Sequence, residues 1–350
     1  MFQTPTWPGL IGALLEGEDL SIADSTWAME QVMLGEAQPA ELAGFLVALR
    51  AKGETVDEIV GFRDAILEHA LPLAVPADVV DIVGTGGDRL RTVNVSTMAA
   101  VVTAAAGAKV VKHGNRAASS ASGSSDVLSA LGVDLTLEPA RVAGILEEVG
   151  ITFVFASAFH PGFRHAAPAR SALGVPTVFN FLGPLCNPAR PEANAVGVAR
   201  SEVIPLIVGV FQTRGASALV FRGDDGLDEL TTTGHSHIWE VGSGAVTEHD
   251  LNPRELGIPR ASLADLQGGT PEENAATARS VLGGAEGPVR DIVLLNAAAA
   301  LVAWDLSHDA SEADRPITGR LAARMADAAA AIDTGAALNK LDAWITATKR

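Results

Sequence analysis

The segment Asp81-Ile82-Val83-Gly84-Thr85-Gly86-Gly87-Asp88 decides how this chain is organised, because a strand pattern ends there in a glycine-rich loop. A β-branched, apolar run over residues 78–83 predicts the strand, and a helical pattern starts near Val95. Glycine has no Cβ and tolerates positive φ, so such a loop lets backbone N–H groups approach a phosphate closely. The N-terminus of the following helix adds partial positive charge. The segment therefore predicts a phosphate-binding loop.

Strand and helix patterns alternate after residue 76. The strand patterns cover residues 78–83, 108–112, 152–155, 177–181, 195–198 and 217–221. Such alternation predicts βαβ units and a mostly parallel sheet, with ligands bound beyond the carboxyl ends of the strands. Residues 238–241 and 245–248, joined across Gly242-Ser243-Gly244, predict a hairpin added to the sheet. Helices are expected from Pro271 onward, over residues 288–304 and over residues 317–332.

Helical patterns dominate before residue 76, where we expect helices over residues 20–34, 39–51 and 56–71. In the second of these, one face collects the apolar residues Leu42, Phe45, Leu46 and Leu49. A thin layer of helices must bury such a face against the rest of the chain or against a second subunit. A homodimer through this layer is therefore a hypothesis.

The expected fold class is α/β, with a small N-terminal helical domain and a larger α/β domain whose mostly parallel central sheet is flanked by helices. We expect the helical domain over residues 1–75, with helices near residues 164–190 packing on it. The α/β domain is expected over residues 76–350 and contains the phosphate-binding loop.

Composition limits the classes of function. The 350 residues, 48% of them hydrophobic, can bury a large core. The net charge of −17 would repel a nucleic-acid backbone, although a local basic pocket could still hold a small phosphorylated ligand. Cys186 is the only cysteine, which excludes internal disulfides and fits a reducing compartment. With no signal-peptide pattern at the N-terminus and no long apolar run, we expect a cytoplasmic protein that binds neither membrane nor nucleic acid.

A second polar loop follows the next strand pattern, from Lys112 to Asp126, and contains two cations, an asparagine and five serines. Serine hydroxyls and backbone amides can donate to phosphate, and Lys112 adds a point charge. The alternative is a flexible serine-rich loop, which the position of the cations at a strand end disfavours. Polar residues also crowd the helix start near Val95, where they either cap the helix or meet a ligand.

Taken together, these motifs resemble the anthranilate phosphoribosyltransferase family. The resemblance covers nearly the whole chain and rests on Gly84-Thr85-Gly86-Gly87-Asp88, Asn94-Val95-Ser96-Thr97, Lys112-His113-Gly114-Asn115-Arg116, Phe179-Asn180-Phe181-Leu182-Gly183-Pro184-Leu185, Asp228-Glu229 and Gly268-Gly269-Thr270-Pro271-Glu272-Glu273-Asn274. It implies transfer of phosphoribose from 5-phosphoribosyl-1-diphosphate to the amino group of anthranilate, with Mg²⁺ bound and diphosphate leaving, in tryptophan biosynthesis.

The resemblance also implies which residues form the site. Phosphoribosyl diphosphate would be surrounded by Gly84, Gly87, Asp88, Thr92, Asn94, Val95, Ser96, Thr97, Lys112, His113, Gly114, Asn115, Arg116, Ala117, Ala118, Ser119, Ser120 and Ser124. Ser96, Asp228 and Glu229 would hold Mg²⁺, which prefers oxygen ligands; on spacing alone, residues 224–229 also fit a solvated acidic turn. Anthranilate would contact Gly84, Asn115 and Arg170, with the Arg170 guanidinium on its carboxylate.

The aromatic amine of anthranilate is neutral and nucleophilic at pH 7, so it needs little activation. We expect the departure of diphosphate to be the step that needs catalysis. We expect an oxocarbenium-like transition state at the ribose C1. Mg²⁺, Lys112 and the amides of Gly86 and Gly87 would stabilise the charge that grows on diphosphate. His113 and His160 are expected to shape the pocket, and no side chain is assigned with certainty to proton transfer.

Two departures from the family pattern leave alternatives open. Arg89 and Arg91 follow the aspartate where a small residue, often glycine, is usual, and they either aid phosphate capture or are solvated. Pro176 stands where an arginine is common.

Two other functions remain as alternatives. A pyrimidine nucleoside phosphorylase would replace the Lys-His-Gly-Asn-Arg loop with a different phosphate site. A non-catalytic, nucleic-acid-binding relative of the same fold would need a basic surface.

Overall fold

The sheet forms the centre of the larger part of the molecule. The computed structural model describes residues 5–116 and 122–350. Its seven strands have the order β3-β2-β1-β4-β5-β6-β7. They are β1 (Val80–Gly84), β2 (Val110–Gly114), β3 (Ile151–Phe155), β4 (Ala193–Gly197), β5 (Ser217–Gly223), β6 (Ser236–Gly242) and β7 (Ala245–Leu251). The first five are parallel, and β6 and β7 add an antiparallel hairpin at the edge, as predicted.

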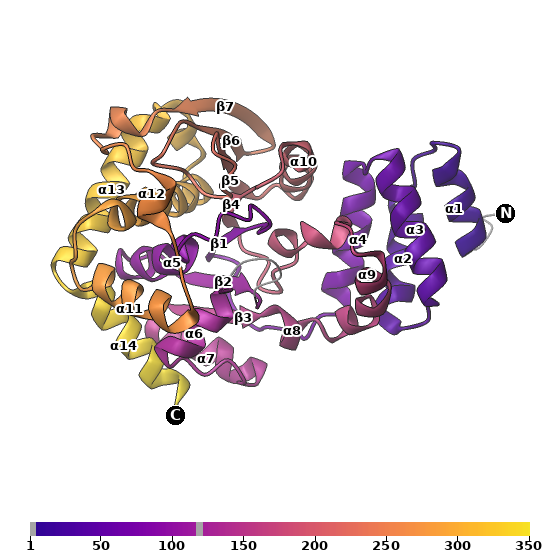
Figure 1. Ribbon diagram of the computed structural model, residues 1–350, viewed down its shortest axis with the longest axis horizontal. Helices are drawn as coiled ribbons and strands as arrows, with labels where there is room; N and C mark the ends of the chain where they lie inside the picture. The colour runs from indigo at the N-terminus through magenta and orange to yellow at the C-terminus, as the bar shows by residue number, and fades with distance from the viewer. Residues whose placement is uncertain (1–4, 117–121) are drawn as a thin grey trace.

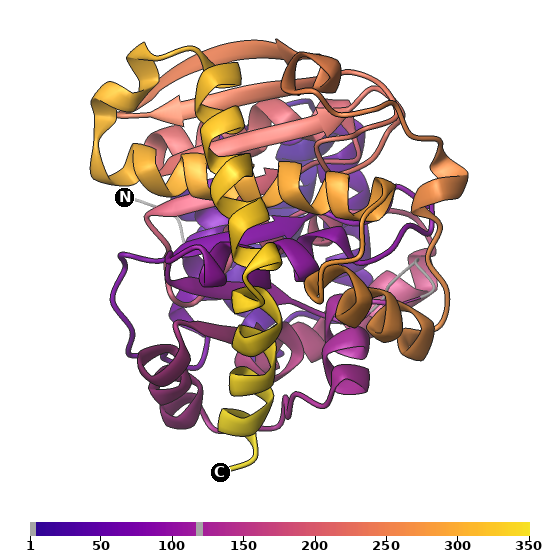
Figure 2. The same ribbon diagram turned by 90° about the vertical axis from the view of Figure 1, so that its left-hand side faces the viewer.

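Helices cover both faces of this sheet. They are α5 (Val95–Ala105), α6 (Ser124–Leu131), α7 (Pro139–Val149), α8 (Ala156–Phe159), α10 (Ile204–Arg214), α11 (Pro271–Leu282), α12 (Pro288–His308), α13 (Ile317–Asp333) and α14 (Ala336–Thr348). Side chains of β5 alternate between two apolar clusters: Leu219 and Phe221 face the cluster with α5 and α12, whereas Ala218 and Val220 face the cluster with α10. Figure 2 shows the C-terminal helices, in yellow, crossing in front of the sheet.

The N-terminal helices form a separate layer at one end of the molecule (Figure 1). They are α1 (Trp7–Leu15), α2 (Ile22–Leu34), α3 (Pro39–Lys52) and α4 (Val56–Glu68), and α9 (Ala167–Leu173) packs on α3. The four apolar residues predicted on one face of α3 are each 2% exposed or less, which confirms that face as buried. The predicted fold class, a small helical layer plus a mostly parallel α/β part, is confirmed.

One predicted strand is wrong. Residues 177–181 contain a short 3-10 helix, Val178–Asn180, instead of a strand. The physical reason is a local side-chain cap: the Asn180 Oδ1 accepts the Thr177 N–H at 2.8 Å and curls the backbone into a turn. The helix α14 was not predicted as a separate element, because its alanine-rich sequence continues the pattern of α13.

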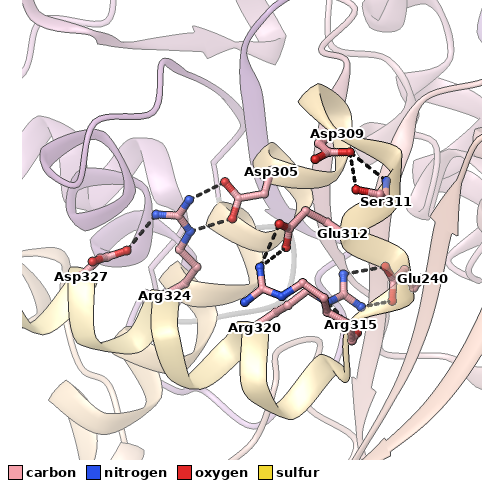
Figure 3. A network of polar contacts seen from close by, with 9 residues as sticks. All are labelled: Glu240, Asp305, Asp309, Ser311, Glu312, Arg315, Arg320, Arg324 and Asp327. Carbon is pink, nitrogen blue, oxygen red and sulfur yellow. Dashed lines mark hydrogen bonds and ion pairs between the residues drawn. The ribbon is translucent and has the colours of Figure 1, made fainter.

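A cavity of about 350 Å³ lies where α12 ends and α13 begins. Its arginines are already paired: Arg320 makes two 2.7 Å bonds to Glu240, and Arg324 lies between Asp305 and Asp327 (Figure 3). His308 beside it contacts Asp78, which precedes β1, so the cavity lies toward the amino ends of the strands. We interpret this network as structural, because ligands of such sheets bind at the opposite ends.

Within the described residues, no helix is both long and apolar enough to cross a membrane.

Candidate active site

Three segments that are distant in the sequence meet at the carboxyl ends of β1 and β4. The Asp228 Oδ2 accepts the N–H of Gly86 in the glycine loop at 2.7 Å. The Glu229 Oε1 accepts the N–H of Ser96, in the first turn of α5, at 3.2 Å. The structure therefore brings together the glycine loop, the start of α5 and the acidic pair that the sequence predicted to act jointly.

Glycines make this meeting possible. A Cβ on Gly84, at the end of β1, would collide with the Asp228 carboxylate, and a Cβ on Gly197, at the end of β4, would collide with the Asp228 backbone. Gly86 and Gly87 adopt φ values of 69° and 89°, in the left-handed region that favours glycine. The acidic pair can cross the two strand ends only because β1 and β4 both end in glycine, which has no side chain.

Three carboxylates crowd this point. Burial, the charge of Asp88 and a hydrogen bond between the two carboxyls together raise the pKa of Asp228 to about 7. Burial and then the charge of Asp228 raise the pKa of Glu229 well above its usual value, while Lys112 opposes that rise. A cation at this point would favour the ionised forms of all three groups.

The donor atoms here suit Mg²⁺, which takes carboxylate and hydroxyl oxygens. In residues 5–116 and 122–350, no group of three or more His, Cys, Asp or Glu side chains is arranged to hold a metal alone. Mg²⁺ usually keeps several waters and completes its shell with substrate phosphates. The residues therefore fit an ion that binds together with a phosphorylated substrate.

Lys112 lies beneath the glycine loop rather than on the surface. It is 2% exposed, and its Nζ donates to the Ile82 carbonyl at 2.5 Å and to the Ser96 Oγ at 3.2 Å. Burial lowers the pKa of Lys112, whereas the charges of Asp81, Glu229 and Asp228 raise it. Its charge is thus directed at the acidic pair and the start of α5.

The start of α5 is tied to two other loops through Asn94. This side chain makes no cap to its own helix. Its Nδ2 donates to the Ser122 carbonyl at 3.1 Å, and its Oδ1 accepts from Asn274 at 2.8 Å. Asn274 also accepts the Gly269 N–H at 2.8 Å, so the Gly268–Asn274 motif is bonded to the start of α5. Thr92 joins it through a bridge to Gln267.

The end of the second loop is held by its neighbours. The Ser124 Oγ donates to the Asn115 carbonyl at 3.3 Å, and the Asn115 Oδ1 accepts from Arg116 and Ser157. A Cβ on Gly114 would collide with Ser124. The predicted donor-site residues Ala117, Ala118, Ser119 and Ser120 lie outside the described residues.

A row of rings extends from β2 to α9. The ring centroids of His113 and His160 are 5.3 Å apart, those of His160 and Phe163 5.2 Å, and those of Phe163 and Phe179 5.9 Å. The half-buried Arg170 guanidinium lies 5.2 Å from the Phe179 ring centroid. Burial lowers the pKa of Arg170. The structure thus connects Arg170 to the loop of Gly114 and Asn115 through aromatic side chains.

Both histidines in this row are neutral at pH 7. Burial lowers the pKa of His113 to about 3 and that of His160 to about 4. The His113 Nδ1 lies 3.0 Å from the Gly183 carbonyl, which can only accept, so neutral His113 is protonated at Nδ1. The backbone of Cys186 lies close enough to the His160 ring to oppose the fall of the His160 pKa. The contact does not have ordinary hydrogen-bond geometry.

Several buried polar atoms of this row have no hydrogen-bond partner among the described residues. They are the His113 Nε2, both ring nitrogens of His160 and the Thr177 Oγ1. Buried polar groups are normally paired, so such a cluster is typical of a pocket for a small polar ligand. The row therefore is a candidate site for an aromatic acceptor with a carboxylate.

The two sequence departures lie at the surface. Arg89 and Arg91 adopt φ values of 62° and 55°, in the left-handed region that is unusual for arginine. Both are exposed, and in the part of the chain that the structure describes neither guanidinium is hydrogen-bonded. Pro176 is also exposed.

Comparison with known proteins identifies the family. Residues 76–338 match the model of the glycosyl transferase family, a/b domain, and residues 8–70 match its helical bundle domain. The anthranilate phosphoribosyltransferase of Leifsonia xyli subsp. xyli is 66% identical over all of both chains. The chain belongs to the anthranilate phosphoribosyltransferase family.

Solved structures of this family have the same fold. The enzyme from Thermus thermophilus has a TM-score of 0.89 at 42% identity, covering 97% of this chain and 99% of that one. The enzyme from Saccharomyces cerevisiae, in complex with PRPP and Mg, has a TM-score of 0.87 at 28% identity, covering 98% of both chains.

Sequence analysis of this anthranilate phosphoribosyltransferase family member missed several residues that build the site. Gly197 was not singled out, although a glycine at a strand end was the available signal. Asp81 was quoted only as part of a strand, yet an aspartate inside an apolar strand pattern marks a buried polar contact. Phe163 carried no signal in the sequence, and neither did Asn187, whose Nδ2 donates to the Asp81 Oδ2 at 2.9 Å.

The buried histidines predict a pH dependence of stability. Unfolded histidine has a pKa of about 6.5, so between pH 6.5 and the folded value of about 4 the unfolded chain binds one proton more than folded His160. Stability therefore falls as pH falls through this window, by up to about 1.4 kcal/mol per pH unit for this group. Denaturant titrations from pH 4.5 to 6.5 should show a shallower slope for His160→Gln. Equal slopes for both proteins would contradict the neutral, buried imidazole.

Proposed function

We propose that this chain is a Mg²⁺-dependent anthranilate phosphoribosyltransferase, which transfers phosphoribose from 5-phosphoribosyl-1-diphosphate to anthranilate and releases diphosphate. One observation supports it most directly: Asp228 and Glu229 bond to the amides of Gly86 and Ser96, and a row of aromatic rings leads from β2 to Arg170. Family membership and this geometry point to the same chemistry.

The donor side of the proposal uses the glycine loop, the start of α5 and the loop after β2. The Gly87 amide and the Ser96 hydroxyl would donate to phosphate oxygens. The Ser124 hydroxyl donates to the Asn115 carbonyl, so we assign it to holding the loop after β2. The Gly86 amide and the Lys112 ammonium are engaged by protein atoms, so we assign them to holding Asp228 and Ser96 in place. Asp228, Glu229 and Ser96 would hold Mg²⁺, which when bound neutralises charge developing on the leaving diphosphate.

The acceptor side of the proposal uses the ring row. Anthranilate would lie against the rings with its carboxylate on Arg170, whose partial burial strengthens an ion pair. The neutral His113 presents an unprotonated Nε2 that can accept a hydrogen bond from the amine. The amine needs no general base to become nucleophilic, so positioning of the two substrates supplies the rest of the rate enhancement.

The test of the proposal mixes the protein with anthranilate, phosphoribosyl diphosphate and Mg²⁺ and follows the loss of anthranilate fluorescence. Omitting any one component should abolish the loss. Phosphorolysis of thymidine or uridine without transferase activity would favour the phosphorylase alternative. Tight, salt-sensitive DNA binding without either activity would favour the nucleic-acid-binding alternative.

The metal assignment predicts the effect of neutralising the acidic pair. Asp228→Asn with Glu229→Gln should reduce kcat/KM by at least about 100-fold and flatten its dependence on Mg²⁺, because the ion loses both charged ligands. Asp224→Asn is the matched control from the same acidic run, since Asp224 is exposed and contacts only the surface His237 among described side chains. A double variant that keeps normal turnover and Mg²⁺ dependence would refute the assignment.

The acceptor assignment predicts a selective defect at Arg170. Arg170→Ala should raise the KM for anthranilate about tenfold or more and leave the KM for phosphoribosyl diphosphate nearly unchanged, because only the carboxylate contact is removed. Arg164→Ala, on the preceding exposed turn, should change neither. An unchanged anthranilate KM in Arg170→Ala would place the carboxylate elsewhere.

We also propose a homodimer through the helical layer, in the cytoplasm. The exposed apolar side chains of this layer include Leu15 of α1 at 73% and Val47 of α3 at 47%, and α1 packs on α3. Such side chains suit an interface between copies. The double substitution Leu15→Glu/Val47→Glu should shift the protein to monomer in sedimentation velocity. A wild-type monomer at micromolar concentration would rule the dimer out.

A further inference from the structure

The backbones of β1 and β2 are not paired at their carboxyl ends, which face the candidate site. They are paired only at Val80 and Val110, whereas β1 pairs with β4, and β2 with β3, over five residues each. The glycine loop leaves the end of β1, and the loop that starts at Asn115 leaves the end of β2. The two donor-site loops thus begin where the sheet is open.

Buried side chains bond to the backbone groups that a continued ladder between β1 and β2 would have paired with each other. A continued parallel ladder would join Ile82 N–H to Val111 C=O and His113 N–H to Ile82 C=O. Instead, the Asn187 Nδ2 donates to the Val111 carbonyl at 2.8 Å, and the Asp81 Oδ1 accepts the His113 N–H at 3.0 Å. The Lys112 Nζ donates to the Ile82 carbonyl at 2.5 Å.

These side chains form one connected group. The Asn187 Nδ2 also donates to the Asp81 Oδ2 at 2.9 Å, and Asp81, Lys112 and Asn187 are 0%, 2% and 3% exposed. If β1 and β2 closed into a regular ladder, all three would lose their backbone partners while still buried, which is strongly unfavourable for polar and charged groups. The open arrangement is therefore fixed before any substrate binds.

The group also reaches the acceptor side. Asn187 follows the short 3-10 helix Gly183–Leu185, whose Gly183 carbonyl holds the His113 Nδ1. The segment from Gly183 to Asn187 thus contacts the end of β2 at two points. It holds the Val111 carbonyl of β2 and the His113 ring.

We propose that Asn187 and Asp81 are positioning residues for phosphoribosyl diphosphate: they hold the carboxyl ends of β1 and β2 apart, so that the two donor-site loops face each other at the spacing the substrate needs. This inference rests on the proposed transferase function. Neither side chain contacts the substrate, and both act through the backbone of β2 and through Lys112.

The chain contains a matched control. Asn194, in β4, is 1% exposed, and its Nδ2 also donates to two backbone carbonyls, those of Pro191 and Ser217. It lies near the amino end of the sheet, away from the donor loops. Asn187→Ala removes three bonds of a buried amide, at 2.8, 2.9 and 3.0 Å, and Asn194→Ala removes two, at 3.2 and 3.3 Å. Asn194→Ala therefore controls for the loss of a buried amide away from the donor loops.

The experiment compares melting temperatures and steady-state kinetics of these two variants. We expect both variants to lose thermal stability, Asn187→Ala more so, but a rise of about tenfold or more in the KM for phosphoribosyl diphosphate only in Asn187→Ala, with the anthranilate KM changed less than about threefold. Equal donor KM values in the two variants would overturn the inference. An inactive wild type would instead overturn the proposed function, so the two failures are distinguishable.

A second variant keeps the inference testable if Asn187→Ala does not fold. Asp81→Asn preserves an acceptor for the His113 N–H but places an amide against the Asn187 amide. It should show the same selective rise in donor KM. A normal donor KM in folded Asp81→Asn would contradict the inference.

Discussion

The Asp228 carboxylate over the ends of β1 and β4 is the interaction on which the rest of the site depends. It bonds to the Gly86 amide and occupies the space that a side chain at position 84 would fill, and the Asp228 backbone occupies the space of a side chain at position 197. The two strand ends must therefore be glycines, and the loop after β5 must return across the sheet. This constraint explains why residues separated by 142 positions meet.

Burying this much negative charge is unfavourable, and the surrounding elements offset it. The amides of the glycine loop and of the first turn of α5 donate to the two carboxylates, and Lys112 lies beneath them. The compensation is incomplete, because the pKa values of Asp228 and Glu229 stay raised. A bound cation would stabilise the ionised carboxylates, so the site suits Mg²⁺ that binds together with a diphosphate.

Much of this arrangement could be predicted from the sequence, because it depends on local patterns. The period-2 and 3.6 patterns gave the α/β class and the buried face of α3, and the glycine loop marked the ligand edge. The strand predicted over residues 177–181 was wrong because the Asn180 cap outweighs the strand preference of its apolar neighbours. Asp81 and Asn187 could not be paired from sequence, since their contact joins residues 106 positions apart without a motif.

The central claim is that Asp228 and Glu229 hold the cation that accompanies phosphoribosyl diphosphate. The most direct measurement is a crystal structure with Mn²⁺ in place of Mg²⁺ and with this substrate, recorded for anomalous scattering. The account predicts an anomalous peak between the Asp228 and Glu229 carboxylates and the substrate's diphosphate oxygens. Diphosphate bound at the glycine loop with the Mn²⁺ peak away from both carboxylates would contradict it.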